Sequence, residues 1–151
     1  MEVEIKQINT LTIGLIENLA VEAHSEGYNF VQRAIYEWKS GMNDFSKEGE
    51  ILLGIFISNL CIGIGGLNVD PYIEDPIIGR IRHVYISQKH RRKGLATLLL
   101  KKIIRMAAKD FKMLRLYTDI PNASSLYESL GFVPSSGIKV THILKDLKNR
   151  P

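Results

Sequence analysis

The sequence predicts one α+β domain, in which helices pack on a central sheet. Apolar runs of strand length, rich in β-branched residues, recur along the chain. Between them, apolar residues repeat at the spacing of amphipathic helices. The length of 151 residues suits a single domain with a substantial core. No linker, repeat or low-complexity segment divides the chain, so we expect residues 1–151 to form one unit.

The N-terminal third predicts one strand and two helices. Val3 to Ile8 alternates loosely between apolar and polar residues, as a half-buried strand does. Residues 11–24 have a moderate helical pattern, which Gly27 is expected to end as a C-terminal cap. A second helix is predicted over 30–40, with Gly41 closing it. A loop follows.

The middle of the chain predicts a hairpin and a further strand. Ile51–Ile57 and Leu60–Leu67 are apolar runs separated by Ser58-Asn59, a two-residue turn that lacks the usual glycine. After a turn-rich loop, Arg80–Ile86 is predicted to be a strand. Its apolar residues do not alternate strictly, which indicates a bulge or burial on both faces.

The C-terminal half begins with the strongest helix signal, from Gly94 to about Lys109. Met113 to Thr118 alternates as a strand, and Asn122 to Leu130 is a short helix that Gly131 is expected to stop. Two late strands complete the prediction: Phe132-Val133 and Ile138 to Leu144.

The turn at Arg91–Thr97 predicts an anion site, because a strand passes there through three cations and a glycine into a helix. Backbone N–H groups at a helix N-terminus have no partner in the helix, and the helix dipole favours negative charge there. Gly94 lets the backbone approach a ligand closely. Arg91, Arg92 and Lys93 can add charge-assisted contacts. We therefore expect a phosphorylated ligand, and a pyrophosphate in particular.

The net charge of +4 is unevenly distributed along the chain. Residues 1–79 contain 4 Lys and Arg against 12 Asp and Glu, whereas residues 80–151 contain 16 against 4. A basic half could bind nucleic acid, in which case DNA affinity would fall steeply with salt. That half has no aromatic stacking pattern and no recognised DNA-binding spacing. A local anionic ligand explains the basic residues better, so no nucleic-acid partner is expected.

Other features exclude further classes of protein. No apolar run approaches the length of a membrane helix, and the acidic, alternating N-terminus does not resemble a signal peptide, so we expect a cytoplasmic protein without a membrane partner. The single cysteine, Cys61, lies in an apolar run and is expected to be a buried, inert thiol. No metal-ligand cluster is visible, and we expect no metal.

Two segments together resemble the GCN5-related N-acetyltransferase (GNAT) superfamily. Val84-Tyr85-Ile86 followed by Arg91-Arg92-Lys93-Gly94-Leu95-Ala96 is similar to the family's acyl-CoA signature, a Gln/Arg-x-x-Gly-x-Gly/Ala loop after its fourth strand. The segment 122–132, Asn-Ala-Ser-Ser-Leu-Tyr-Glu-Ser-Leu-Gly-Phe, is similar to its later Asn…Tyr-Glu-x-Leu-Gly-Phe signature. The two occur in the family's order, and the resemblance covers about residues 51–147.

The resemblance implies an acyltransferase fold with a mixed, mostly antiparallel sheet that is splayed at the cofactor cleft and has helices on both faces. The co-substrate implied is acetyl-CoA. The backbone of 84–86 would pair with its pantetheine arm, and the N–H groups of 92–97 would hold its pyrophosphate. Tyr127 would be the general acid that protonates the departing thiolate. The cofactor-binding residues implied are Val84, Tyr85, Ile86, Arg91, Arg92, Lys93, Gly94, Leu95, Ala96, Thr97, Asn122, Ser124 and Tyr127.

The general base remains open, because many relatives place a glutamate on the strand before the glycine loop and this chain has none there. His83 is a chemically suitable candidate, with an ordinary pKa near 6.5, or else a structural histidine. Glu22 and Glu26, near the end of the first helix, are acidic alternatives, Asp119 could act through water, and His142 is expected to be structural. An acceptor amine that arrives neutral needs no dedicated base.

The expected reaction is acetyl transfer to a primary amine of a small molecule or peptide, by direct attack in a ternary complex. The acidic first half suggests a cationic acceptor, with Glu22 and Glu26 as candidate acceptor-binding residues; the alternative is that these carboxylates only solvate the surface. A non-catalytic acyl-CoA-binding domain of the same fold is the other function considered. The acceptor, the acyl chain length and the choice between a monomer and a homodimer are left open.

Overall fold

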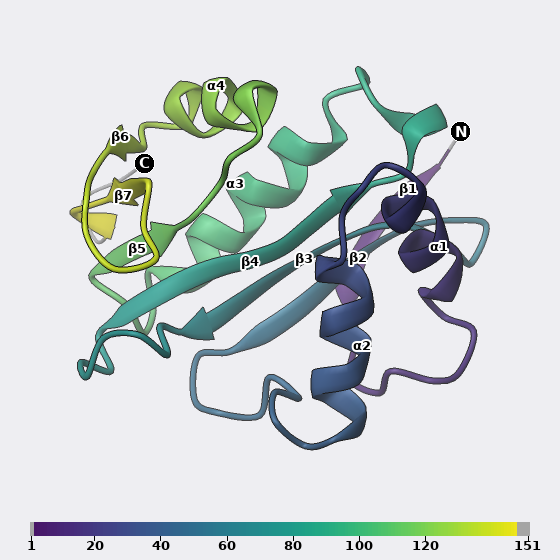
Figure 1. Ribbon diagram of the computed structural model, residues 1–151, viewed down its shortest axis with the longest axis horizontal. Helices are drawn as coiled ribbons and strands as arrows, with labels where there is room; N and C mark the ends of the chain where they lie inside the picture. Colours follow the sequence, from purple (N-terminus) through teal and green to yellow (C-terminus); the bar gives the residue numbers. More distant parts are fainter. Residues whose placement is uncertain (1, 148–151) are drawn as a thin grey trace.

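The computed structural model describes residues 2–147 and contains one seven-stranded sheet with helices on both faces (Figure 1). The strand order is β1-β2-β3-β4-β5-β7-β6. The strands are β1 (Val3–Gln7), β2 (Ile51–Ile57), β3 (Leu60–Val69), β4 (Ile78–Ile86), β5 (Met113–Leu116), β6 (Val133–Pro134) and β7 (His142–Leu144).

The sheet opens between β4 and β5. All neighbouring strands are antiparallel except this pair, which is parallel. The pairing joins only Ile78–Arg80 of β4 to Met113–Arg115 of β5. From Ile81 onward, β4 therefore has β3 on one side and no strand on the other. This arrangement confirms the mixed, mostly antiparallel and splayed sheet that was expected.

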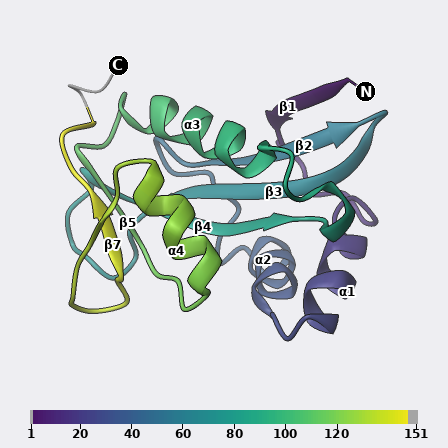
Figure 2. The same ribbon diagram turned by 90° about the horizontal axis from the view of Figure 1, so that it is seen from above.

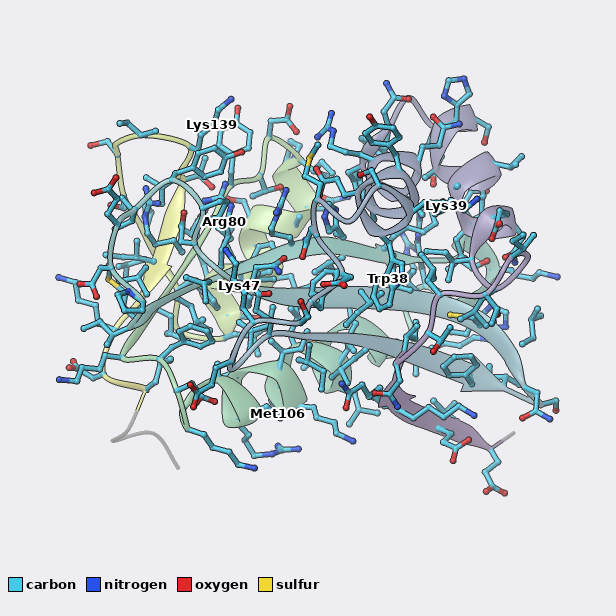
Figure 3. The ribbon with its side chains drawn as sticks, turned by 90° about the horizontal axis from the view of Figure 1, so that it is seen from below. Trp38, Lys39, Lys47, Arg80, Met106 and Lys139 are labelled. Atoms are coloured by element: carbon cyan, nitrogen blue, oxygen red, sulfur yellow. The ribbon has the colours of Figure 1, made fainter. Side chains whose placement is uncertain are left out.

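The helices form two layers. The α-helices are α1 (Glu17–Ser25), α2 (Phe30–Lys39), α3 (Leu95–Ala107) and α4 (Pro121–Ser129), and a short 3₁₀ helix, η1, covers Gln88–His90. Figure 2 shows α3 on one side of the sheet and α1 and α2 on the other. Figure 3 shows the same separation, with Met106 of α3 on the side opposite α2. One core cluster lies under α3 and α4 and a second under α1 and α2, so both faces of the central strands are buried.

The turn residues explain several element ends. The N–H of Tyr28 donates to the Ala23 carbonyl at 2.9 Å, and Gly27 between them has φ +92°, so α1 ends in a Schellman motif as predicted. Ser58 and Asn59 have φ of 50° and 68°. The hairpin therefore uses left-handed backbone at both turn positions without a glycine.

The β4 bulge is confirmed. Ile64 of β3 pairs with Tyr85, but Gly66, two residues on, pairs with Arg82, so β4 has an extra residue in this stretch. His83 lies there with φ +59°. The bulge resets the alternation of β4, which explains why its apolar residues do not follow one face.

Three element boundaries were predicted wrongly. The helix expected over 11–24 begins only at Glu17, because the segment before it turns at Gly14, where φ is +90°. The strand expected from Met113 to Thr118 ends at Leu116. The late strand expected from Ile138 is confined to His142–Leu144, because Lys139 has φ +52°, which interrupts extended backbone.

Candidate functional site

A cavity of about 610 Å³ lies where β4 loses its neighbour. It is bounded by the end of β4, the glycine loop and α4. Most residues expected at the acyl-CoA site line this cavity: Val84, Tyr85, Ile86, Arg91, Arg92, Gly94, Leu95, Ala96, Thr97 and Asn122. Lys93, Ser124 and Tyr127 are not among its lining residues. The free edge of β4 is therefore open to a ligand that pairs as an extra strand.

The glycine loop has the backbone of an anion cradle. Arg92 and Gly94 have φ of 63° and 77°, and α3 begins at Leu95 directly after them. No side chain caps the first turn of α3, so its N–H groups face outward at the positive end of the helix dipole. A Cβ built on Gly94 would meet nothing within 4 Å. The positive φ favours glycine here, and the space in front of it fits a phosphate.

Glu22 and Glu26 of α1 hold the end of β4 and the following loop. The Tyr85 hydroxyl lies 2.8 Å from a Glu22 oxygen and also contacts Glu26, and its single hydrogen is donated to one of the two carboxylates at a time. Arg91 donates two hydrogen bonds to Glu26, at 2.8 and 2.9 Å. The Gln88 N–H and the Ser87 hydroxyl donate to Glu22. We call this set, Glu22, Glu26, Tyr85, Ser87, Gln88 and Arg91, the α1 clamp.

The α1 clamp shifts the pKa of its members. Hydrogen bonds from Arg91 lower the pKa of Glu26 to about 2 and raise that of the guanidinium. Burial works to raise the pKa of Glu22, but bonds from Gln88, Tyr85 and Ser87 outweigh it and lower the pKa. Burial, followed by its two carboxylate partners, raises the pKa of Tyr85. Both glutamates are therefore ionised and have hydrogen-bond partners within the protein, and Glu26 also lines the first cavity; their binding of an acceptor stays a prediction.

The α1 clamp also directs the Arg91 side chain away from the helix N-terminus. Arg91 Nε donates to the Ile86 carbonyl at 2.8 Å while the other guanidinium nitrogens contact Glu26. Arg91 was expected among the phosphate contacts. In this structure it fixes the path from β4 into the loop. Arg92 also lines the cavity, and within residues 2–147 its side chain forms no hydrogen bond or ion pair.

A second cavity, of about 420 Å³, continues from the first along β4. The two share five lining residues: Tyr28, Phe30, Val84, Ile120 and Ala123. The second cavity reaches between β4, the start of α4 and the loop before β7. A ligand in the first cavity can therefore meet a second ligand at Val84.

Tyr127 lines the second cavity from α4. It is 7% exposed and packs edge-on against Phe132, with ring centroids 5.6 Å apart. Burial raises the pKa of its hydroxyl, so it is protonated at neutral pH. Within residues 2–147, no hydrogen bond holds this hydroxyl. It is thus a proton donor without a competing partner.

His83 also lines the second cavity, but its protonation is unfavourable. Burial, followed by the nearby charges of Arg82 and Arg33, lowers the pKa of its imidazole to about 3. A hydrogen bond with the backbone of Phe30 opposes this shift. His83 is therefore neutral at pH 7 and a far weaker base than an ordinary histidine, which does not favour it as the general base.

His142 has the structural environment that was expected. Its Nδ1 lies 2.9 Å from the Thr141 hydroxyl, and its Nε2 lies 2.9 Å from the Glu128 carboxylate. The Ser124 hydroxyl lies 3.0 Å from the same Nε2. Ser124 is thus directed to β7 instead of the first cavity. Asp119 is exposed and is the one carboxylate among the described residues that line the second cavity.

Cys61 is buried, as predicted, with 1% exposure in the cluster under α1 and α2. Burial raises the pKa of its thiol, which disfavours the reactive thiolate. Among the described residues, no group of three or more potential ligands could hold a metal. The helices of that same part of the chain are too short or too polar to cross a membrane.

Sequence reasoning missed the cations of the second cavity. Arg80 and Arg82 come from β4, Arg33 from α2 and Lys139 from the loop before β7. Two arginines two residues apart in an apolar strand were a signal for a polar site on β4. The positions of Arg33 and Lys139 depend on tertiary packing and had no local signal.

Comparison with known proteins agrees with this geometry. Residues 14–132 match the pattern of the Acetyltransferase (GNAT) family. A protein from Exiguobacterium sp. 255-15 assigned as an acetyltransferase is 30% identical, with 96% of this chain and 94% of that chain covered and a TM-score of 0.86. PH1933 from Pyrococcus horikoshii OT3 is 21% identical, with 95% and 98% covered and a TM-score of 0.73.

A more distant structure has the same fold. The ribosomal-protein-S18-alanine N-acetyltransferase from Escherichia coli is 14% identical, with 96% of this chain and 94% of that chain covered and a TM-score of 0.67. The family match spans both motifs, the glycine loop and the segment that ends at Phe132. With the splayed sheet and the cavity at its opening, these matches show that the chain belongs to the GNAT family of acetyltransferases.

Proposed function

We propose that this protein transfers an acetyl group from acetyl-CoA to an amine by direct attack within a ternary complex. The observation that supports this most is the pair of cavities that meet at Val84, one beside an anion cradle and one beside a protonated tyrosine. Two ligands bound in these cavities would have their reacting ends adjacent, which is the condition for direct transfer.

The first cavity suits the acyl-CoA. The N–H groups of Arg92 to Thr97 hold the pyrophosphate, and Gly94 leaves space for it. The free edge of Val84–Ile86 pairs with the pantetheine amides. When bound, the co-substrate supplies an acetyl thioester, whose carbonyl carbon is the electrophile. The α1 clamp keeps Tyr85 and the start of the loop in position for this contact.

Tyr127 serves as the general acid. The amine nitrogen forms a bond to the acetyl carbon, the carbon–sulfur bond breaks, and the Tyr127 hydroxyl gives its proton to the departing sulfur. The excess proton of the new amide nitrogen goes to solvent, from which the phenolate regains a proton. Burial keeps Tyr127 protonated before the step. His83, with a pKa of about 3, plays no part as a base, so the amine must arrive neutral or lose its proton through water beside Asp119.

The test is an amine panel with acetyl-CoA, following free thiol release, in the parent protein and in Tyr127→Phe. We expect kcat to fall by about 100-fold in the variant, the scale of a lost general acid, with acetyl-CoA affinity unchanged. Ser129→Ala, an exposed position on the same helix, is the control and should keep full activity. Unchanged kcat in Tyr127→Phe would refute the acid role.

The alternative is a non-catalytic acyl-CoA-binding domain, which the missing strand glutamate favours. It predicts acetyl-CoA binding by calorimetry but no thiol release above the buffer rate with any amine of the panel. Release that depends on both the amine and Tyr127 excludes this alternative.

A further inference from the structure

The second cavity has a marked excess of positive charge. Four cations line it, Arg33, Arg80, Arg82 and Lys139, against the single carboxylate of Asp119. The first cavity differs, because its Arg91 is neutralised by Glu26. An acceptor that enters the second cavity therefore meets a positive field, which favours anions and repels cations.

The buried layer behind the cavity does not cancel this charge. Asp70, whose side chain is fully buried, contacts Arg80 at 3.3 Å and Arg115 at 2.8 Å. One carboxylate is thus shared between two guanidiniums. Arg115 also donates to the Ile138 carbonyl at 2.6 Å, which holds the loop that carries Lys139. The set of Asp70, Arg80 and Arg115 keeps one net positive charge.

The outer cations are available to a ligand. Arg33 and Lys139 are exposed, and no ion pair involves either of them in the part of the chain that the structure describes. Arg82 forms an ion pair with Glu37 at 3.7 Å, so a ligand would share this guanidinium with that carboxylate, whereas Arg33 and Lys139 are unshared within those described residues. Figure 3 shows Arg80 and Lys139 toward the same end of the molecule.

A buried, unpartnered pair of polar atoms lies beside these cations. His83 Nε2 and a Glu37 carboxylate oxygen are 3.9 Å apart, and neither atom has a hydrogen-bond partner among residues 2–147. The His83 side chain is only 3% exposed, although the residue lines the cavity. His83 and Lys139 also have positive φ, a strain that concentrates at ligand sites.

We infer that the acceptor is an amine that also carries an anionic group, a carboxylate or a phosphate. The anion is held by Arg33, Arg82 and Lys139, whose guanidinium and ammonium groups suit such oxygens. This inference rests on the proposed function, because it assigns the second cavity to the acceptor. It replaces the cationic acceptor suggested by the acidic first half, whose Glu22 and Glu26 are occupied in the α1 clamp.

The test compares matched amines that differ only in the anion. Alanine is paired with alaninamide, O-phosphoethanolamine with ethanolamine, and spermidine represents cationic acceptors. We expect kcat/KM to be about tenfold higher for the anionic member of at least one pair, the scale of one charge-assisted hydrogen bond. The pair in which the anionic member has the higher kcat/KM identifies the anion as a carboxylate or a phosphate. Equal or lower values for both anionic members, or a preference for spermidine, would overturn the inference.

Variants test which residues cause the higher kcat/KM for the anionic amine. Arg33→Gln and Lys139→Gln should each reduce it about threefold or more through KM, whereas Arg33→Lys retains the charge and should retain most of the preference. Lys101→Gln, an exposed position on α3 outside both cavities, is the matched control. A preference unchanged in both Gln variants would contradict the assignment.

Binding measurements test the anion site separately from the proposed catalytic function. Calorimetry on the CoA-loaded protein compares N-acetylalanine with its amide, and N-acetylated O-phosphoethanolamine with N-acetylethanolamine. Selective binding of an anion without thiol release would overturn the catalytic function and support the anion site. Thiol release with no selectivity in rate or binding would support the function and overturn the anion site. Neither release nor binding would overturn both.

Discussion

The α1 clamp makes a quantitative prediction about stability. Arg91 lowers the pKa of Glu26 from its ordinary value of 4.5 to about 2. Taken at face value, this shift corresponds to about 3 kcal/mol of folding free energy. The Arg91 side chain is 39% exposed, however, so screening by solvent must reduce that value. We expect Glu26→Gln to lower the free energy of unfolding at pH 7 by about 1–2 kcal/mol.

The pH dependence identifies the charge as the cause. Because the folded pKa is lowered, the stabilisation is complete above the unfolded pKa of 4.5 and is lost as the pH falls through about 2. Gln does not titrate, so the difference between parent and variant should shrink as the pH falls. At a pH roughly one unit below the unfolded value, we expect it to be about half its size at pH 7.

The assay is urea unfolding at several pH values, followed by the fluorescence of Trp38, the single tryptophan. Glu4→Gln is the matched control, because Glu4 pairs with Lys6 at 3.5 Å between well-exposed side chains and should contribute almost nothing. At pH 7 the melting temperature of Glu26→Gln should be roughly 3–6 °C lower. A loss of stability that is equal at pH 7 and near pH 3.5 would refute the electrostatic explanation, since packing does not titrate.

Two further predictions concern the ligand site. Gly94→Ala forces a Cβ into left-handed backbone at φ +77° but creates no clash, so stability should fall by only about 1 kcal/mol; calorimetry should show acetyl-CoA affinity reduced severalfold, and unchanged affinity would contradict the cradle. The pKa of His83, about 3, predicts that no step in activity between pH 5 and 8 depends on this residue. His83→Gln should therefore keep the shape of the pH–rate profile, whatever its kcat; loss of a step near pH 6 would indicate that His83 titrates as a base after all.

Much of the fold could be predicted because its signals are local. The helix from Gly94 has a strong amphipathic pattern, and the hairpin of β2 and β3 has two apolar runs with a short turn. The β4 bulge could be predicted from a break in alternation. The boundaries that failed, at residues 11–16 and 138–141, belong to segments whose conformation is set by turns and by contacts far away in the sequence. For example, the Thr141 N–H donates to the Leu116 carbonyl.

The candidate site also contains features that a local sequence pattern predicts and features that depend on distant contacts. The glycine loop is a continuous segment, so its backbone role was evident from residue order. Which partner Arg91 takes was not evident, because Glu26 lies 65 residues away. Likewise, the shift in the pKa of His83 depends on burial under α2 and on Arg33. Neither burial nor distant charge is encoded by a local pattern.

The distribution of charge gains a different meaning once the chain is folded. Carboxylates of the acidic first half lie against basic residues of the second half: Glu26 against Arg91, Glu37 against Arg82, and Asp70 against Arg80 and Arg115. These contacts join α1 to the glycine loop, α2 to β4, and the loop after β3 to β4 and β5, so these carboxylates already have basic partners within the protein. Among the described cations of the second half without such a partner, Arg92 lines the first cavity and Lys139 lines the second, while others, such as Lys101 and Arg105, lie on α3. The pyrophosphate would thus be bound mainly by the backbone N–H groups of the glycine loop, whereas the positive field of the second cavity would favour an anionic acceptor.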